Sequence, residues 1–248
     1  MHRLAHRARK LGLALMFAAG SATSAQAGQL RDADAPEAAS VTERDIAASN
    51  QEIASAYGAL VGMWSADFEQ LGMQFVPPKL LRYRGAVRTA CGVMSGNNAE
   101  YCPSLNAIYF DEVFIAQQAK EAARALGTDG DMVAVGIIAH EMGHAVAAQL
   151  DDWSNVPYEN EAAADCLAGA FAQQSAKDGT LEKGDIEEAF FGLAAAADPT
   201  PRMTGNRRVD SRIALRMALM GHGTRDERMG NFKAGYEGGP GACLESFR

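Results

Sequence analysis

The sequence predicts a single α+β domain that is mainly helical and carries a small β-sheet. Apolar residues recur at helical spacing over much of the chain. Few segments favour strands: Leu80–Tyr83 follows a Pro-Pro pair that imposes extended backbone, and Asn106–Asp111 is short, aromatic and β-branched. Hydrophobic residues make up 48% of the 248 positions and charged residues 22%, which is typical of a globular protein with a real core.

The first 27 residues are predicted to be a cleavable secretory signal. Four basic residues precede the apolar run LGLALMFAAG, and the segment ends in Ala25-Gln26-Ala27, the small-residue pattern of a cleavage site. The apolar run is too short to span a bilayer core of roughly 30 Å. We therefore expect residues 1–27 to be a signal peptide, 28–45 a linker and 46–248 the folded domain. The mature protein is expected to be exported, either periplasmic or extracellular, without stable membrane insertion.

The net charge indicates which partners to expect, and the number of cysteines indicates disulfide bonds. Removing residues 1–27 takes away four basic residues and no acidic one, which leaves a net charge of −12. Such a surface repels phosphate backbones, so nucleic acid is not expected as a partner. Four cysteines in an exported chain indicate two disulfides, with three possible pairings.

The helices follow in order from their apolar spacing and their end signals. Asp111 is suited to cap a helix that Gly127 terminates, and Pro157 is suited to open one. Thr224 and Glu227 have the spacing of a capping box. The Gly- and Asn-rich stretch between Cys91 and Cys102 is predicted to be a loop. The predicted helices are Thr42–Leu71, 112–126, Asp131–Leu150, Pro157–Lys177, a segment from 184 to Pro199, and a last one from Thr224 to just after Tyr236.

The motif HEMGH, residues 140–144, lies inside the apolar helix Asp131–Leu150. His140 and His144 are four residues apart, so both imidazoles lie on one face and can bind one ion. Glu141 lies about 100° around the helix, close enough to act on a water molecule without being a ligand. A zinc ion held in this way lowers the pKa of its bound water from 15.7 to about 7, so the motif indicates hydrolysis.

A catalytic zinc needs a third protein ligand, which the next helix supplies. Glu161 and Asp165 are four residues apart and lie on one face of this helix, and Glu161 follows His144 by 17 residues. Glu161 is predicted to bind the metal, while Asp165 accepts the free N–H of a ligating histidine and fixes its orientation. Glu159 is the rival ligand, but no carboxylate follows it at the same spacing.

With these residues the chain resembles a bacterial family, the "putative neutral zinc metallopeptidases", which belongs to the zincins with a glutamate third ligand. The similar segments are CG at Cys91-Gly92, YCPSLNAIYFD, HEMGH, EAAADCLAG, GDIEEAF, HGTRDER and GGPGACLESF, between Cys91 and Phe247. The resemblance implies a zincin-like metallopeptidase domain with an HExxH active-site helix and one Zn²⁺ per chain. It implies the ligands His140, His144 and Glu161, and Glu141 as the general base. It also implies the disulfides Cys91–Cys102 and Cys166–Cys243.

Two features depart from the family pattern. Ala145 stands where family members often have another histidine after the motif, and residues Pro199–Met220 carry a run of arginines unlike the usual connection. These departures concern substrate preference more than metal binding, and the sequence assigns the Pro199–Met220 segment no function.

Three further residues or segments have two interpretations each. His222 is a possible transition-state donor to the oxyanion, although closing the turn before the last helix is the simpler and favoured role. Asn106–Asp111 is either an ordinary core strand or an exposed edge strand that binds extended peptide. Cys166 follows Asp165 directly, but it points about 100° away from the Glu161–Asp165 face, which favours a disulfide over a thiolate ligand.

The sequence as a whole predicts an exported zinc metallopeptidase that hydrolyses peptide bonds in a peptide or protein substrate. The alternative is a non-catalytic, zinc-stabilised binding or assembly factor on the same fold. Glu141 favours the enzyme, because a purely structural zinc site has no need of a base and usually closes its fourth position.

Overall fold

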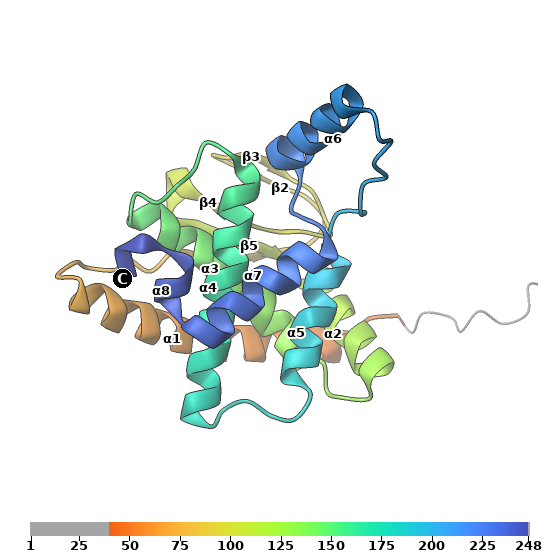
Figure 1. Ribbon diagram of the computed structural model, residues 1–248. Coiled ribbons are helices and arrows are strands. Elements are labelled where there is room, and N and C mark those ends of the chain that lie inside the picture. Colours follow the sequence, from red (N-terminus) through yellow and green to blue (C-terminus); the bar gives the residue numbers. More distant parts are fainter. Residues whose placement is uncertain (1–39, 248) are drawn as a thin grey trace, which may run out of the picture. The chain divides into compact units, whose positions relative to one another are not determined.

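The computed structural model describes residues 40–247, so the predicted signal peptide and most of the predicted linker lie outside the described residues. The described chain is mainly helical with a small sheet, as the sequence predicts (Figure 1). The helices are α1 (Glu43–Gln70), α2 (Glu112–Leu126), α3 (Asp131–Gln149), α4 (Pro157–Asp178), α5 (Asp185–Ala195), α6 (Arg207–Met220), α7 (Arg225–Gly238) and α8 (Pro240–Cys243). The strands are β1 (Lys79–Tyr83), β2 (Val87–Thr89), β3 (Gly92–Met94), β4 (Ala99–Cys102) and β5 (Ala107–Asp111), with 3₁₀ turns at Pro103–Leu105 and Glu245–Phe247.

The helix ends follow the capping residues found in the sequence. Thr42 caps α1 in a capping box with Asp45, so residues 43–45 belong to the helix and not to the predicted linker. Asp111 accepts a hydrogen bond from the Val113 backbone N–H at 3.1 Å and begins α2, which Gly127 ends with a φ of 75°. Local side-chain chemistry therefore fixes where these helices start and stop.

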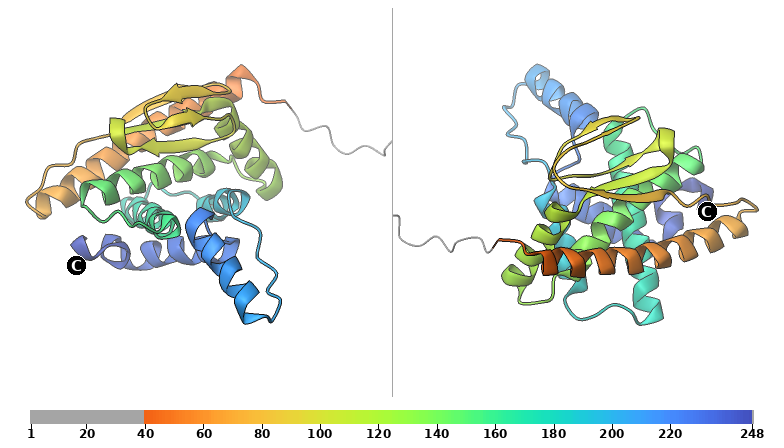
Figure 2. Two further views of the ribbon diagram at one scale, coloured as in Figure 1. Left: turned by 90° about the horizontal axis from the view of Figure 1, so that it is seen from above. Right: turned by 180° about the vertical axis from the view of Figure 1, so that it is seen from behind.

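Helix α3 lies at the centre of the molecule, between the sheet on one side and α4 on the other (Figure 2). It also packs against α1, α2 and α5, and this explains why it is apolar on nearly every face. Among the largest fully buried side chains are Trp64, Phe68, Ile138, Met142, Leu167 and Phe232. The histidines of the HEMGH motif are therefore held on the most enclosed helix of the fold.

The main sheet has the strand order β1-β5-β4. β5 pairs in parallel with β1 and antiparallel with β4, so it is the central strand. Of the two interpretations of Asn106–Asp111, the core strand is confirmed and the exposed edge strand is wrong, because strand order depends on the whole topology and not on the strand's own residues. The edge strand nearest α3 is β4, which packs against that helix.

The stretch between Cys91 and Cys102 is not the simple loop that the sequence predicts. It contains β3, which forms a two-stranded antiparallel sheet with β2, and β4 of the main sheet. Strands of three and four residues are too short to show a clear alternation, and the glycine and asparagines around them favour a loop prediction.

Two glycines allow α7 to pack closely on α4. A Cβ atom at Gly169 would lie 1.9 Å from the Phe232 carbonyl oxygen, and one at Gly235 would lie 1.8 Å from the Cys166 carbonyl oxygen. No side chain fits such a contact, so both positions require glycine. This close packing places the start of α7 beside the Glu161–Asp165 face of α4.

Helix α6 projects away from the rest of the described chain (Figure 1) and makes its main contact with α4. None of its described side chains is buried. Among residues 40–247, no helix combines the length and the apolar character needed to cross a membrane.

Candidate metal centre

His140 and His144 lie one helical turn apart on α3, with their ring centres 4.7 Å from each other. Both are buried, at 8% and 7% exposure. Buried imidazoles without partners are costly, so something must interact with their ring nitrogens. The carboxylates of Glu161 and Asp165, both on α4, lie next to these rings.

Glu161 on α4 completes a triangle with the two histidines. Its Oε2 atom lies 3.2 Å from His140 Nε2, and its Oε1 atom lies 3.4 Å from His144 Nε2. One ligand atom from each of the three residues lies within 4.8 Å of the others. The rival Glu159 is exposed and accepts a hydrogen bond from the Ser154 hydroxyl. The structure thus brings Glu161 to the histidines and leaves Glu159 outside.

The donor set fits a zinc ion. Two imidazole nitrogens and one carboxylate are the ligands of many catalytic zinc sites. Glu161 Oε2 is buried and makes no hydrogen bond of good geometry, although His140 lies close to it. Burial raises the pKa of a carboxyl, but the two neighbouring histidines outweigh burial and lower the pKa of Glu161. A carboxylate that is buried, ionised and short of a hydrogen bond is suited to a cation.

Asp165 and Arg228 fix the orientation of His140 from behind. The His140 Nδ1–H donates to Asp165 Oδ1 at 2.8 Å, which leaves Nε2 directed toward Glu161. Arg228 donates to both oxygens of Asp165, at 2.9 and 2.7 Å, and a third bond goes from its Nη1 to the Ala196 carbonyl at 3.2 Å. Asp165 is fully buried and Arg228 is 3% exposed. Burial disfavours ionised Asp165, but His140 and Arg228 together lower the pKa of this carboxyl.

Glu141 is held beside the histidines by the edge strand. Its Oε2 atom accepts a hydrogen bond from the Tyr101 backbone N–H of β4 at 2.7 Å. Because β4 is an edge strand, this N–H has no partner strand, and Glu141 takes the place of one. The carboxylate is therefore positioned by the backbone of the sheet and not by another charged side chain.

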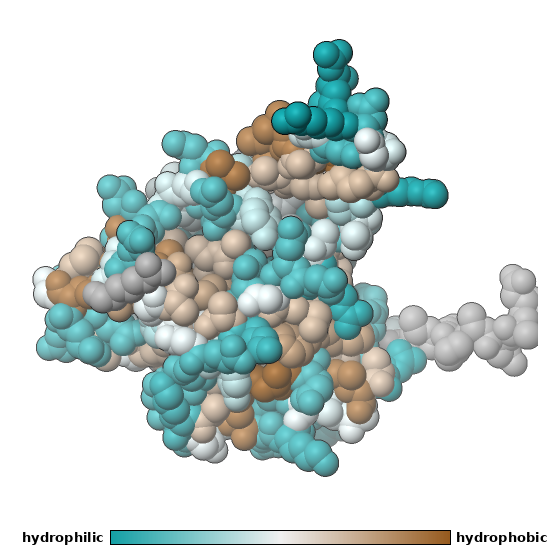
Figure 3. Space-filling view, in the orientation of Figure 1, coloured by the Kyte–Doolittle hydropathy of each residue, from teal (hydrophilic) through white to brown (hydrophobic). Residues whose placement is uncertain are grey.

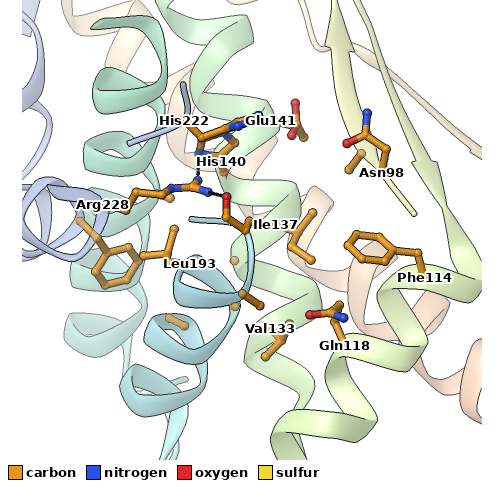
Figure 4. A pocket seen from close by; sticks show the side chains of 18 of the residues that line it. Asn98, Phe114, Gln118, Val133, Ile137, His140, Glu141, Leu193, His222 and Arg228 are labelled. Atoms are coloured by element: carbon orange, nitrogen blue, oxygen red, sulfur yellow. Dashed lines mark hydrogen bonds between the residues drawn. The ribbon is translucent and has the colours of Figure 1, made fainter. Parts of the chain in front are cut away.

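Glu141 and His140 line a cavity of about 570 Å³ (Figure 4). The cavity extends from these residues along α3 between α2 and α5, over apolar side chains such as Phe114, Val133, Ile137 and Leu193. Its lining also includes Asn98 from the segment before β4, and His222 and Arg228 from the C-terminal part of the chain. A mostly apolar cavity with a few converging polar groups is the usual form of a small-molecule or peptide site.

The structure places His222 in the wall of the same cavity as His140 and Glu141, with its side chain exposed to solvent (Figure 4). Trp153, between α3 and α4, packs its ring 5.7 Å from that of His144.

Three contacts of the site could not be assigned from the sequence. Arg228 lies within the segment HGTRDER, which marks the family resemblance but does not reveal the partner of the arginine. The sequence did not indicate the Tyr101 backbone or Trp153, because their contacts depend on where β4 and the connection after α3 lie relative to Glu141 and His144.

The two cysteine pairs lie at bonding distance in the arrangement that the resemblance implies. Cys91 pairs with Cys102 across an S–S distance of 1.99 Å, and Cys166 pairs with Cys243 across 2.10 Å. The second pair joins the residue after Asp165 to the C-terminal part of the chain.

Comparison with known proteins gives both a family and relatives. A family model described as "Putative neutral zinc metallopeptidase" matches residues 10–247, so the family pattern begins well before the Cys91 boundary drawn from motifs. Two relatives bear the name "Uncharacterized protein YpfJ", from Escherichia coli strain K12 and from Escherichia coli O6:H1 strain CFT073. Each is 32% identical over 202 residues, which cover 74% of this chain and 66% of the relative.

The chain therefore spans about two thirds of the length of these curated relatives. No solved structure matches the chain closely enough to be compared. The family match covers nearly the whole sequence and includes all of the residues that converge at the site. The chain belongs to the family described as putative neutral zinc metallopeptidases.

Proposed function

We propose that this protein is an exported, zinc-dependent metallopeptidase that hydrolyses peptide bonds. The observation that carries the proposal is the convergence of His140, His144 and Glu161 within 4.8 Å, beside a cavity that Glu141 also lines. Three ligands next to an open cavity suit catalysis, since a purely structural zinc site usually has four protein ligands and no free position. Two disulfides agree with an oxidising compartment outside the cytosol.

The residues of the site have separate roles in this proposal. His140, His144 and Glu161 hold the zinc ion, which supplies a Lewis acid that makes water acidic near neutral pH. Glu141 accepts a proton from the attacking water at its carboxylate and donates it to the amide nitrogen of the leaving group. Asp165 keeps the His140 Nδ1–H as a donor, so that Nε2 remains free for the metal. His222 is proposed as a donor to the carbonyl oxygen of the scissile bond.

The decisive test compares wild type with Glu141→Gln. Glutamine keeps the size of the side chain and a hydrogen-bond acceptor for the Tyr101 N–H, but it cannot take a proton. A proteome-derived peptide library, with and without a chelator, first identifies a substrate for the wild-type protein. On that substrate we expect Glu141→Gln to keep zinc and its melting temperature but to lose about 10²–10⁴-fold in hydrolysis rate.

The exposed substitution Glu237→Gln on α7 is the matched control and should hydrolyse at the wild-type rate. Equal rates for wild type and Glu141→Gln would show that the activity comes from another site. If both proteins bind zinc and neither cleaves any peptide of the library, the non-catalytic binding or assembly factor becomes the better explanation.

A further inference from the structure

The segment of residues 199–220, which we call the basic arm, leaves and rejoins the fold at the cavity. Just before it, the Asp198 N–H donates to the Gly223 carbonyl at 2.9 Å, and the Gly223 N–H donates back to Asp198 Oδ2 at 3.0 Å. Ala196 and His222, which flank these bonds, both line the cavity beside Glu141. The arm is therefore attached to the rim of the proposed active site, and a molecule bound to it is held near the metal ligands.

The basic arm has a charge opposite to that of the rest of the chain. It contains five arginines and one acidic residue, Asp210, in a protein of net charge −8. The Asp210 carboxylate accepts hydrogen bonds from the Thr204 and Gly205 backbone N–H groups and so is already occupied. Within residues 40–247 none of the arm arginines forms an ion pair. Arginines four residues apart on a helix repel one another, so the arm lacks the anions that would stabilise it.

Apolar side chains share the exposed face of the arm with these arginines. Arg208, Arg212, Leu215 and Leu219 follow the spacing i, i+4, i+7, i+11 and therefore form one stripe along α6. Leu215 and Leu219 are 59% and 48% exposed, and a shallow depression on this face is lined by Arg207, Arg208, Ser211, Arg212 and Leu215. Figure 3 shows hydrophobic and hydrophilic residues side by side on the projecting helix. This face is suited to an occupant that offers both anionic and apolar groups.

We propose that the basic arm is an exosite that binds an acidic, partly apolar segment of the polypeptide to be cleaved. This proposal rests on the proposed function, because the cavity at the base of the arm is the proposed site of hydrolysis. A polypeptide is favoured over an anionic lipid surface by the pattern of the stripe. A membrane-binding helix separates its apolar and basic residues onto opposite faces, whereas here two arginines and two leucines share one face.

The binding test uses the full mature chain with Glu141→Gln, so that the probe is not cleaved. The probe is a fluorescein-labelled twelve-residue peptide with the repeat Glu-Glu-Leu, and its binding is measured by fluorescence anisotropy at low and high salt. We expect binding that weakens with added salt. The triple substitution Arg208→Gln, Arg212→Gln, Arg216→Gln should weaken it by about tenfold, as expected for the loss of three exposed charge pairs.

The matched control removes three exposed arginines elsewhere, with Arg44→Gln, Arg88→Gln and Arg124→Gln, and should bind like the parent protein. The exosite is refuted if both triple variants bind equally, or if a Gln-Gln-Leu peptide binds as well as the acidic one. It is also refuted if phosphatidylglycerol vesicles bind through the arm more tightly than the peptide does. Because binding is measured without hydrolysis, a missing peptidase activity would contradict the proposed function and leave this result unaffected.

Discussion

At the scale of single residues, the site is a chain of contacts from the metal ligands to Arg228. Asp165 is fully buried, and a buried carboxylate is unfavourable unless charged or hydrogen-bonding groups compensate it. Here His140 binds one of its oxygens and Arg228 binds both. The arginine comes from α7, so the packing of α7 on α4 helps to orient His140, a candidate metal ligand, through Asp165.

The ligand assignment predicts opposite outcomes for two neighbouring carboxylates. Glu161→Ala removes one corner of the triangle and should strongly lower the zinc content from about one ion per chain. Glu159→Ala is the matched control on the same helix and should keep full zinc. Asp165→Asn should weaken zinc affinity by roughly 10–100-fold, since it disturbs the orientation of His140. Metal content after dialysis measures all three, and zinc kept by Glu161→Ala but lost by Glu159→Ala would reverse the assignment.

Helical spacing explains why most of these residues could be predicted from the sequence. His140 and His144 lie on one helix and Glu161 and Asp165 on another, so each pair follows from counting along the chain. Arg228 could not be found in this way. It is 63 residues from Asp165, and their contact exists only because two glycines bring α4 and α7 together.

At the scale of elements, the N-terminus of α3 depends on a carboxylate from another helix. Gly130 is the N-cap residue and has no side chain to cap with. Glu188 of α5 accepts hydrogen bonds from the Gly130 and Met132 backbone N–H groups, at 3.0 and 2.9 Å, and is fully buried. This cap fixes the start of the helix that carries HEMGH, but it also gathers acidic groups around Asp131.

Asp131 should make the stability of the fold depend on pH. Burial and the negative charges of Asp129, Asp185, Glu188 and Glu52 raise the pKa of Asp131 from 3.8 to about 7. The folded state then holds the proton more tightly than the unfolded state. The contribution of the protonated Asp131 carboxyl to the stability of the fold is full below about pH 4 and is lost as the pH rises toward 7.

Asp131→Asn removes this titration. The difference in unfolding free energy between variant and wild type should therefore grow in favour of the variant from pH 4 to pH 8, by on the order of 1 kcal/mol. Urea unfolding at several pH values measures it. Asp226→Asn, exposed in the first turn of α7, is the control and should be slightly destabilising, because it removes a favourable charge at a helix N-terminus. A pH-independent difference for Asp131→Asn would contradict the prediction.

The contact between α4 and α7 predicts a contrast between two glycines of one helix. Gly235→Ala places a methyl group 1.8 Å from the Cys166 carbonyl oxygen, so the helices must separate, and the fold should lose about 3 kcal/mol or more. Gly230→Ala meets no atom within 4 Å and should stabilise α7 by roughly 0.5–1 kcal/mol. Thermal unfolding measures both, and similar melting temperatures for the two variants would show that the helices do not cross this closely.

The elements themselves were predictable in proportion to their length and their end signals. The predicted helices lie within a few residues of α1 to α5 and α7, because capping residues and glycines mark their ends. β3 and β4 were missed because three or four residues cannot show a pattern of alternation. The place of β5 in the middle of the sheet is a property of the topology, and no local pattern carries it.

At the scale of the whole molecule, the described chain consists of a body and one projecting arm. The body holds every residue of the candidate metal centre, whereas the arm consists of residues 199–220, which the family match also covers. None of the described side chains of α6 is buried, so hydrophobic periodicity does not predict how the helix sits in the fold. The arm differs from the body in charge as well as in burial, and for this reason we assign it a role in binding and not in stability.

The disulfide between Cys166 and Cys243 ties the C-terminal part of the chain to α4, directly after Asp165. It joins residues 77 positions apart, whereas Cys91–Cys102 joins residues 11 apart. A longer closed loop removes more entropy from the unfolded chain. The chain-entropy model therefore gives about 4–5 kcal/mol for Cys166–Cys243 and about 3 kcal/mol for Cys91–Cys102.

Replacing Cys166 and Cys243 together by alanine should therefore destabilise the protein more than replacing Cys91 and Cys102. It should also weaken zinc binding, because α4 carries Glu161 and Asp165. Urea unfolding and zinc titration of the two double variants measure the contrast, and peptide mapping of the non-reduced wild type tests the pairing itself. Free thiols or a Cys91–Cys243 linkage in that map would refute the pairing. Equal zinc affinity in both double variants would show that the C-terminal tie does not support the metal ligands.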